Sequence, residues 1–168
     1  RYARMLLNLG ELDGVRIFKP ETVRLMTSVQ TPANVTSRRG LGWDIDSGYS
    51  GPRGKLFPLG SYGHTGWTGT SLWVDPFSKS FVIFLANRNH PTEKGSVIAL
   101  RAKLGTLAAE AITDFDFASV SGALTPRSES GDKPTALKTP THQALNGIDV
   151  LVKNSFAPLK GKRVGLIT

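Results

Sequence analysis

Residues 61–70 of the chain read SYGHTGWTGT, and residues 71–74, SLWV, follow them directly. Three glycines, Gly63, Gly66 and Gly69, surround a single histidine, His64. Glycine weakens a strand unless another group must approach its backbone closely. An acyl-transfer site needs such an open backbone, because its N–H groups must reach the oxygen on which negative charge develops. The stretch therefore predicts one wall of a site that binds an acyl group.

The segments around this stretch predict an antiparallel sheet. Strands are expected over residues 42–46, 70–74 and 80–87, and residues 75–79 (DPFSK) predict the turn between the last two. The strand at 80–87 is apolar at nearly every position, which predicts a central strand covered on both faces. Asp44 and Asp46 alternate with apolar residues, so both are predicted to face solvent.

Helices are expected at both ends of this sheet region. Residues 1–9 predict the end of a helix, residues 11–17 a tight hairpin with an Asp-Gly turn, and Pro20 the first turn of a short helix. A longer helix is expected over residues 95–112, with one apolar face packed on the sheet. The residues of that face are Val97, Leu100, Leu104, Leu107, Ala108 and Ala111.

Composition divides the 168 residues into three parts. Residues 1–115 predict one globular region, and residues 116–144 a linker, because Ser, Thr, Pro, Gly and Lys replace the apolar residues there. Globular character returns over residues 145–168. The chain begins within a helical pattern and stops within a strand pattern, which predicts a piece of a longer protein.

Charge and composition narrow the classes of function. The formal net charge of +8 is scattered along the chain and has no aromatic interleaving, which argues against nucleic-acid binding. It predicts an ordinary solvated surface, and an anionic polymer partner such as cell-wall material is the alternative. No apolar run approaches the ~20 residues of a membrane span. The chain has no cysteine, and its three histidines lack metal-ligand spacing, so no cofactor or metal is predicted.

The stretch at residues 62–73 resembles the third conserved box of the β-lactamase-related serine hydrolases, which include class C β-lactamases, DD-peptidases and esterases. Their boxes are Ser-x-x-Lys, Tyr-x-Asn, and a Lys-Thr-Gly or His-Thr-Gly triplet on a sheet-edge strand. The hairpin at 11–17, the helix after Pro20, the Gly42-Trp43 strand and residues 87–91 (NRNHP) match the family in order. The resemblance implies an α+β fold over residues 1–115, with helices packed on an antiparallel sheet.

The resemblance also implies a role for each residue of the triplet region. His64, Thr65 and Gly66 stand where the family has its catalytic triplet, the backbone N–H of Trp67 where it has an oxyanion donor, and Thr68 beside it as a substrate contact. Neither Ser-x-x-Lys nor Tyr-x-Asn occurs upstream of His64, so this chain alone is expected to have no turnover. Histidine titrates near neutral pH whereas lysine stays charged, which favours peptidase or esterase activity over dedicated β-lactam hydrolysis.

A second resemblance lies at the end of the chain. Residues 147–152 and 156–168 resemble the opening of the exo-β-N-acetylmuramidase family, which trims peptidoglycan fragments and has a Rossmann-like α/β domain. The two resemblances together imply a bifunctional cell-wall hydrolase that is periplasmic or extracellular and acts on a small molecule or a peptidoglycan-derived substrate. The alternative is that the first region is a non-catalytic peptidoglycan-binding module for the muramidase. An unrelated α/β domain remains the alternative for residues 145–168.

Overall fold

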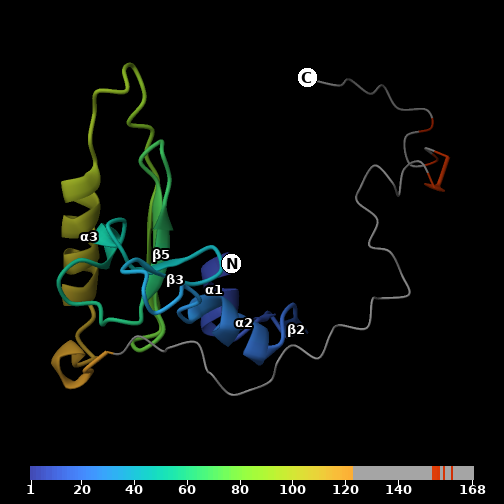
Figure 1. Cartoon of the computed structure of the whole chain (residues 1–168), viewed down its shortest axis with the longest axis horizontal. Coiled ribbons are helices and arrows are strands. Elements are labelled where there is room, and N and C mark those ends of the chain that lie inside the picture. The colour runs from blue at the N-terminus through green and yellow to red at the C-terminus, as the bar shows by residue number, and fades with distance from the viewer. Residues whose placement is uncertain (123–152, 156, 158–159, 161–168) are drawn as a thin grey trace. The chain divides into compact units, whose positions relative to one another are not determined.

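The computed structural model describes residues 1–122, 153–155, 157 and 160 (Figure 1). The chain divides into two units, Arg1–Ser128 and Glu129–Thr168, and the account that follows concerns the first. Most of the predicted Rossmann-like elements at 145–168 and most of the predicted linker lie outside the described residues. Within the described residues, no helix is both long and apolar enough to cross a bilayer.

A five-stranded antiparallel sheet organises residues 1–122, as predicted. Its strands, in spatial order, are β3 (Arg38–Arg39), β4 (Asp44–Asp46), β5 (Tyr62–Thr65), β6 (Ser71–Asp75) and β7 (Ser80–Phe84). The helices are α1 (Tyr2–Leu7), α2 (Pro20–Thr27) and α3 (Ile98–Glu110), with short 3-10 turns η1 (Gly51–Arg53) and η2 (Phe117–Ser119). The predicted hairpin is confirmed as β1 (Glu11–Leu12) and β2 (Val15–Arg16).

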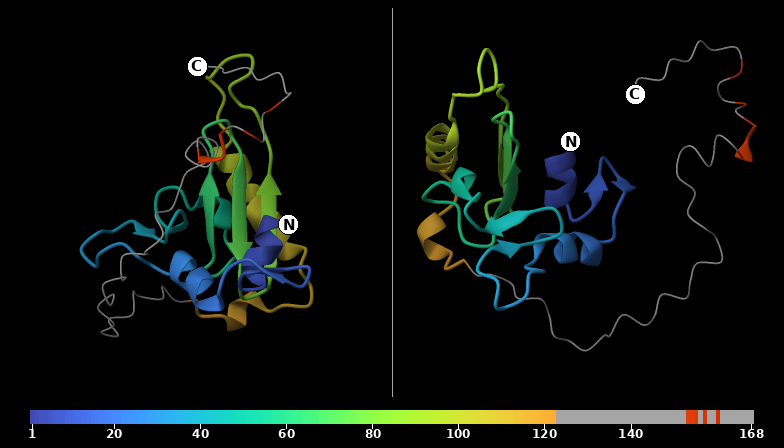
Figure 2. Two further views of the ribbon diagram at one scale, coloured as in Figure 1. Left: turned by 90° about the vertical axis from the view of Figure 1, so that its right-hand side faces the viewer. Right: turned by 45° about the horizontal axis from the view of Figure 1, so that its top comes forward.

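Helices cover the two faces of the sheet, with α1 and α2 on one side and α3 on the other (Figures 1 and 2). Side chains alternate along a strand, so neighbouring residues of β6 enter different cores. Val74 packs with Tyr62 and the apolar residues of α1 and α2 in the larger core. Trp73 points the other way and packs with Phe57 and with Ala109 of α3. The sheet therefore separates two cores and carries residues of both.

The prediction that residues 80–87 form a central strand is wrong. β7 is the last strand of the sheet in the described residues and pairs with β6 alone. Its side chains alternate in burial, and Phe81, Ile83 and Leu85 are exposed. The run of apolar residues shows that the strand is hydrophobic, but the order of strands depends on pairing that no single segment encodes.

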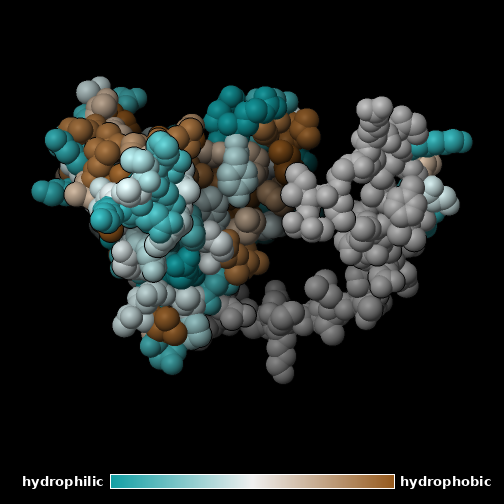
Figure 3. All heavy atoms as spheres, turned by 90° about the horizontal axis from the view of Figure 1, so that it is seen from above, coloured by the Kyte–Doolittle hydropathy of each residue, from teal (hydrophilic) through white to brown (hydrophobic). Residues whose placement is uncertain are grey.

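Helix α3 confirms the predicted helix but not its predicted buried face. Arg101, Gly105 and Ala109 are buried, at a spacing of four residues, whereas Leu100 and Leu107 are exposed. Figure 3 shows apolar side chains gathered on the side of the molecule where α3 lies. The helix turns its small residues inward because the backbone of η1 approaches it: a Cβ on Gly105 would overlap the Pro52 carbonyl group. Close packing of backbone, rather than the apolar stripe, sets the orientation of α3.

The globular region extends past residue 115. Phe117 of η2 packs with Phe57, their ring centroids 5.7 Å apart, and with the core beneath α3. A Cβ on Gly122 would meet the backbone of Leu59 at 2.7 Å, so the chain still follows the domain surface there. Residues 116–122, which composition assigns to a linker, are therefore in contact with the domain.

We expect Gly105→Ala to lower the free energy of unfolding by about 2 kcal/mol, because a methyl group there forces α3 away from η1. Gly51→Ala is the matched control: a Cβ at Gly51 has no neighbour within 4 Å, and the change is expected within about 0.5 kcal/mol of wild type. Urea unfolding of the two variants measures both effects. Equal stability of the two would contradict the packing described for α3.

Candidate active site

Strand β5 ends with His64 and Thr65 of the predicted triplet, and Gly66 follows it. The strand lies third of five in the sheet, so the implied placement of the triplet on an edge strand is wrong. β6 pairs with β5 along its whole length, whereas the ladder with β4 holds a single pair, Asp44 with Gly63. On the β4 side, His64 and Thr65 therefore have no strand partner among the described residues. Beyond Gly63, the backbone of β5 on this side is therefore accessible to another group.

Close packing inside the domain requires two glycines of the stretch, which corrects the prediction that a ligand requires them. A Cβ on Gly63 would overlap the Trp73 indole ring, which fills the space above the strand. A Cβ on Gly66 would overlap the Thr70 hydroxyl group across the turn. Trp73 is itself fixed, because its Nε1–H donates to the Ser61 hydroxyl at 2.9 Å. Packing inside the domain thus accounts for Gly63 and Gly66.

His64 is exposed, and an arginine that the sequence analysis did not select lies beside it. Arg39 Nη2 lies 3.1 Å from His64 Nε2, and His64 Nδ1 lies 2.9 Å from the Thr65 carbonyl oxygen. The network assigns the proton to Nδ1, which donates to the carbonyl, and leaves Nε2 to accept from the guanidinium group. In this arrangement the permanent positive charge next to the triplet is that of Arg39.

Asp44 balances this charge from inside the protein, and the prediction that it faces solvent is wrong. It is fully buried, and its Oδ1 lies 2.7 Å from Arg39 Nη1. The Ser47 hydroxyl group donates to the same oxygen at 2.8 Å, while Oδ2 has no hydrogen-bond partner in the described residues. A row of polar contacts therefore runs from the interior to the surface of the site, from Asp44 through Arg39 to His64.

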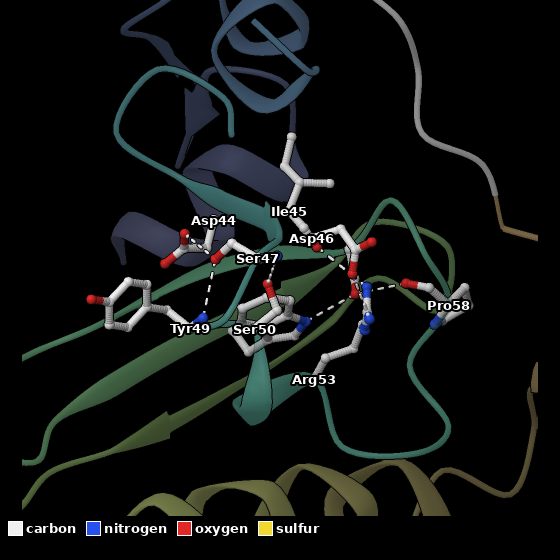
Figure 4. A network of polar contacts seen from close by, with 10 residues as sticks. Asp44, Ile45, Asp46, Ser47, Tyr49, Ser50, Arg53 and Pro58 are labelled. Atoms are coloured by element: carbon white, nitrogen blue, oxygen red, sulfur yellow. Dashed lines mark hydrogen bonds and ion pairs between the residues drawn. The ribbon is translucent and has the colours of Figure 1, made fainter. Parts of the chain in front are cut away.

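A network of short polar contacts holds the loop that follows β4 (Figure 4). The Tyr49 amide donates to the Ser47 hydroxyl at 3.1 Å, and the Ser47 amide donates to the Ser50 hydroxyl at 3.0 Å. Arg53 Nη2 lies 2.9 Å from Asp46 Oδ1. These contacts fix the loop against β4, so that Asp44 keeps its partners and Tyr49 is held at the surface.

The backbone after the triplet forms a tight turn over residues 66–69. The Gly69 amide donates to the Gly66 carbonyl at 3.1 Å, and the Gly66 amide donates to the Thr70 carbonyl at 2.7 Å. Trp67 is 70% exposed, and Thr68 is also exposed. Among the described residues the Trp67 amide has no hydrogen-bond acceptor. This N–H group is therefore available to a substrate oxygen.

A pocket of about 480 Å³ lies next to this turn. Thr65, Gly66 and Trp67 form one wall, Tyr49 and Pro52 come from the loop after β4, and Arg88, Arg101 and the start of α3 complete the lining. His64 is outside this pocket, because alternation along β5 places its side chain opposite that of Thr65. The triplet thus has two sides, one carrying His64 and Arg39, the other a pocket with two arginines.

Burial of the Arg101 side chain, and then the positive charge of Arg88, lower the pKa of Arg101. The five residues selected from sequence, His64, Thr65, Gly66, Trp67 and Thr68, are brought together as a strand end and its turn. Arg39, Asp44, Arg88 and Arg101 were not selected. Only Arg88 had a signal, as part of the NRNHP match; the others are brought to the site by sheet pairing and helix packing. No cluster of three or more metal-binding side chains occurs among the described residues.

Comparison with known proteins agrees with this geometry. The profile of the family described as Beta-lactamase matches residues 1–106, which include the whole sheet and the triplet. The chain belongs to the Beta-lactamase family. The match ends inside α3, so it includes Arg39, Asp44, Arg88 and Arg101.

Individual relatives match a shorter part of the chain. A protein of Escherichia coli strain K12 named "Putative D-alanyl-D-alanine carboxypeptidase" is 34% identical over 87 residues, which are 51% of this chain and 19% of that protein. A protein of the same name from Salmonella paratyphi B is 36% identical over 89 residues, 52% of this chain and 20% of that protein. The chain spans about a fifth of the length of these relatives.

We expect the Asp44–Arg39 pair to couple more strongly than a surface pair. In a double-mutant cycle of Asp44→Asn and Arg39→Gln, the coupling free energy should be about 1–2 kcal/mol, because Asp44 is buried while Arg39 is partly exposed. The Arg16–Glu11 pair, whose side chains are each nearly half exposed, is the control and should give less than about 1 kcal/mol. Thermal unfolding measures both cycles. Equal coupling free energies for the two pairs would contradict the role given to the burial of Asp44.

Proposed function

We propose that this chain supplies one wall of the active site of a serine hydrolase that acts through an acyl-enzyme. The observation that carries the proposal is the Trp67 amide, which has no acceptor among the described residues and directly follows the triplet, beyond the last residue of β5 that pairs with β4. Membership of the Beta-lactamase family supports it. A hydrolase of this type attacks a carbonyl carbon and must stabilise the negative oxygen that forms.

Each residue of the wall has a proposed role. The Trp67 N–H donates to the developing oxyanion, and the hydroxyl of Thr65 and the nearby Thr68 contact the substrate. His64 and Arg39 orient the substrate's anionic groups and influence proton movement at the nucleophile. The attacking serine belongs to residues outside this chain. Its oxygen bonds to the substrate carbonyl carbon, the amine leaves with a proton, and water then releases the acid.

The proposed substrate is a peptide that ends in D-alanine and derives from peptidoglycan. The names of the Escherichia coli and Salmonella relatives support this class. The histidine of the triplet favours a peptidase or esterase over a dedicated β-lactamase. Such a substrate places the intact protein in the periplasm or outside the cell.

The proposal extends to residues 145–168 on sequence alone. There the resemblance to the exo-β-N-acetylmuramidase family supports a second, Rossmann-like domain that acts on muramyl ends of the same material. A non-catalytic role for the first region is the second candidate. The exposed Trp67 and Tyr49 side chains beside the pocket favour it, because Trp and Tyr are enriched at binding interfaces.

We expect the intact protein to be labelled by a fluorescent penicillin and to release D-alanine from a D-Ala-D-Ala peptide. Thr65→Val should lower kcat/KM about tenfold or more, because it removes a substrate hydrogen bond. Thr22→Val, on the exposed side of α2, is the matched control.

The present chain is expected to show neither labelling nor turnover. Covalent labelling of one of its own serines would contradict the assignment of the nucleophile to residues outside the chain. An intact protein that binds peptidoglycan fragments but is not labelled would favour the binding module instead.

A further inference from the structure

We propose that Arg88 and Arg101 are positioning residues, which together bind all four carbonyl groups of the turn at residues 66–69 and so hold its Trp67 amide for an oxyanion. The inference rests on the proposed function in one respect only, the use of this amide in catalysis. We call the two arginines and their hydrogen bonds to the four carbonyl groups the clamp. Its existence can be tested separately from catalysis.

Arg101 binds the two ends of the turn. Its Nε donates to the Gly69 carbonyl at 2.8 Å, and its Nη2 donates to the Gly66 carbonyl at 2.8 Å. The Gly66 carbonyl also accepts the Gly69 amide that closes the turn. Because the guanidinium group is planar and its donors are rigidly spaced, it fixes the separation of these two carbonyls.

Arg88 binds the two carbonyls between them. Its Nε donates to the Trp67 carbonyl at 2.8 Å, and its backbone amide donates to the Thr68 carbonyl at 2.8 Å. Its guanidinium carbon lies 4.5 Å from the centre of the Trp67 ring. Nη1 donates to the carbonyls of Glu93 and Gly95, each at 3.0 Å, and so ties the turn to the segment before α3.

The result is a turn whose acceptors are all occupied while two of its donors are not. The amides of Trp67 and Thr68 have no acceptor among the described residues. A peptide whose carbonyl is bound by a cation is polarised, so its N–H becomes a stronger donor. Oriented backbone N–H groups of this kind attract anions. The turn is therefore suited to a negative oxygen.

The positive charges of Arg88 and Arg101 also favour an anion at the turn. Arg101 is only 8% exposed, and neither it nor Arg88 forms an ion pair with a carboxylate among the described residues. Arginine is rarely buried without a charged partner. Carbonyl groups satisfy part of this charge, and an anion at the turn would add to its stabilisation. A purely structural anchor for α3 would not require two cations on a single turn.

The first experiment uses this chain labelled with ¹⁵N. In Arg101→Met, hydrogen exchange of the Gly69 amide should rise about tenfold, because its acceptor is no longer fixed. The Trp67 amide resonance should shift, and Val74, buried in the other core, should keep its protection as evidence of an intact fold. Arg101→Lys should restore only part of the effect. Arg24→Met, on the exposed side of α2, should change neither amide.

Arg88→Met provides the same test at a more exposed position and serves if Arg101→Met does not fold. Unchanged Trp67 and Gly69 amides in a folded variant would overturn the clamp.

The second experiment measures acylation in the intact protein. Arg101→Met should lower kcat about tenfold or more, as loss of an oxyanion donor does, with KM within about twofold. A loosened turn with unchanged kcat would overturn the positioning role and leave only a structural clamp. Absence of acylation in the wild-type protein would instead overturn the proposed function, without affecting the result for the turn.

Discussion

A buried arginine joins the helix and the sheet at the point where the candidate site lies. Arg101 extends from α3 and binds the Gly66 and Gly69 carbonyls, each at 2.8 Å. It is buried on the same face of α3 as Gly105, where η1 approaches the helix closely. The turn that it binds carries the exposed Trp67 side chain and forms one wall of the pocket. Replacing the arginine removes a charge and two carbonyl partners together, which is why its effect should exceed that of a surface substitution.

The elements fixed by local chemistry could be predicted from the sequence. The Asp13-Gly14 turn and the Pro20 helix start depend on backbone angles that those residues favour. The prediction failed where long-range packing decides. The apolar stretch at 80–87 contributes the outer strand β7 instead of a central one, and α3 buries an arginine while Leu100 and Leu107 stay exposed. Asp44 was predicted to face solvent because strand alternation cannot show that β3 brings a cation to it.

The part of the candidate site that is contiguous in sequence could be predicted, but the charged residues that surround it could not. Residues 64–68 lie together because they are adjacent in the chain. Their charged neighbours come from separate elements: Arg39 from β3, Arg88 from the segment after β7, and Arg101 from α3. These cations surround the triplet on both sides of β5. All of these residues lie within residues 1–106, the part of the chain that matches the Beta-lactamase family.

The most direct test is a crystal structure of the intact protein with a phosphonate or boronate analogue of a D-alanyl peptide bound to its nucleophile. We expect the oxyanion-mimicking oxygen to lie about 3 Å from the Trp67 nitrogen. Arg88 and Arg101 should keep their hydrogen bonds to the turn. An oxygen directed away from this amide, or a Trp67 amide bonded to another protein group, would contradict the proposed role of this amide as an oxyanion donor.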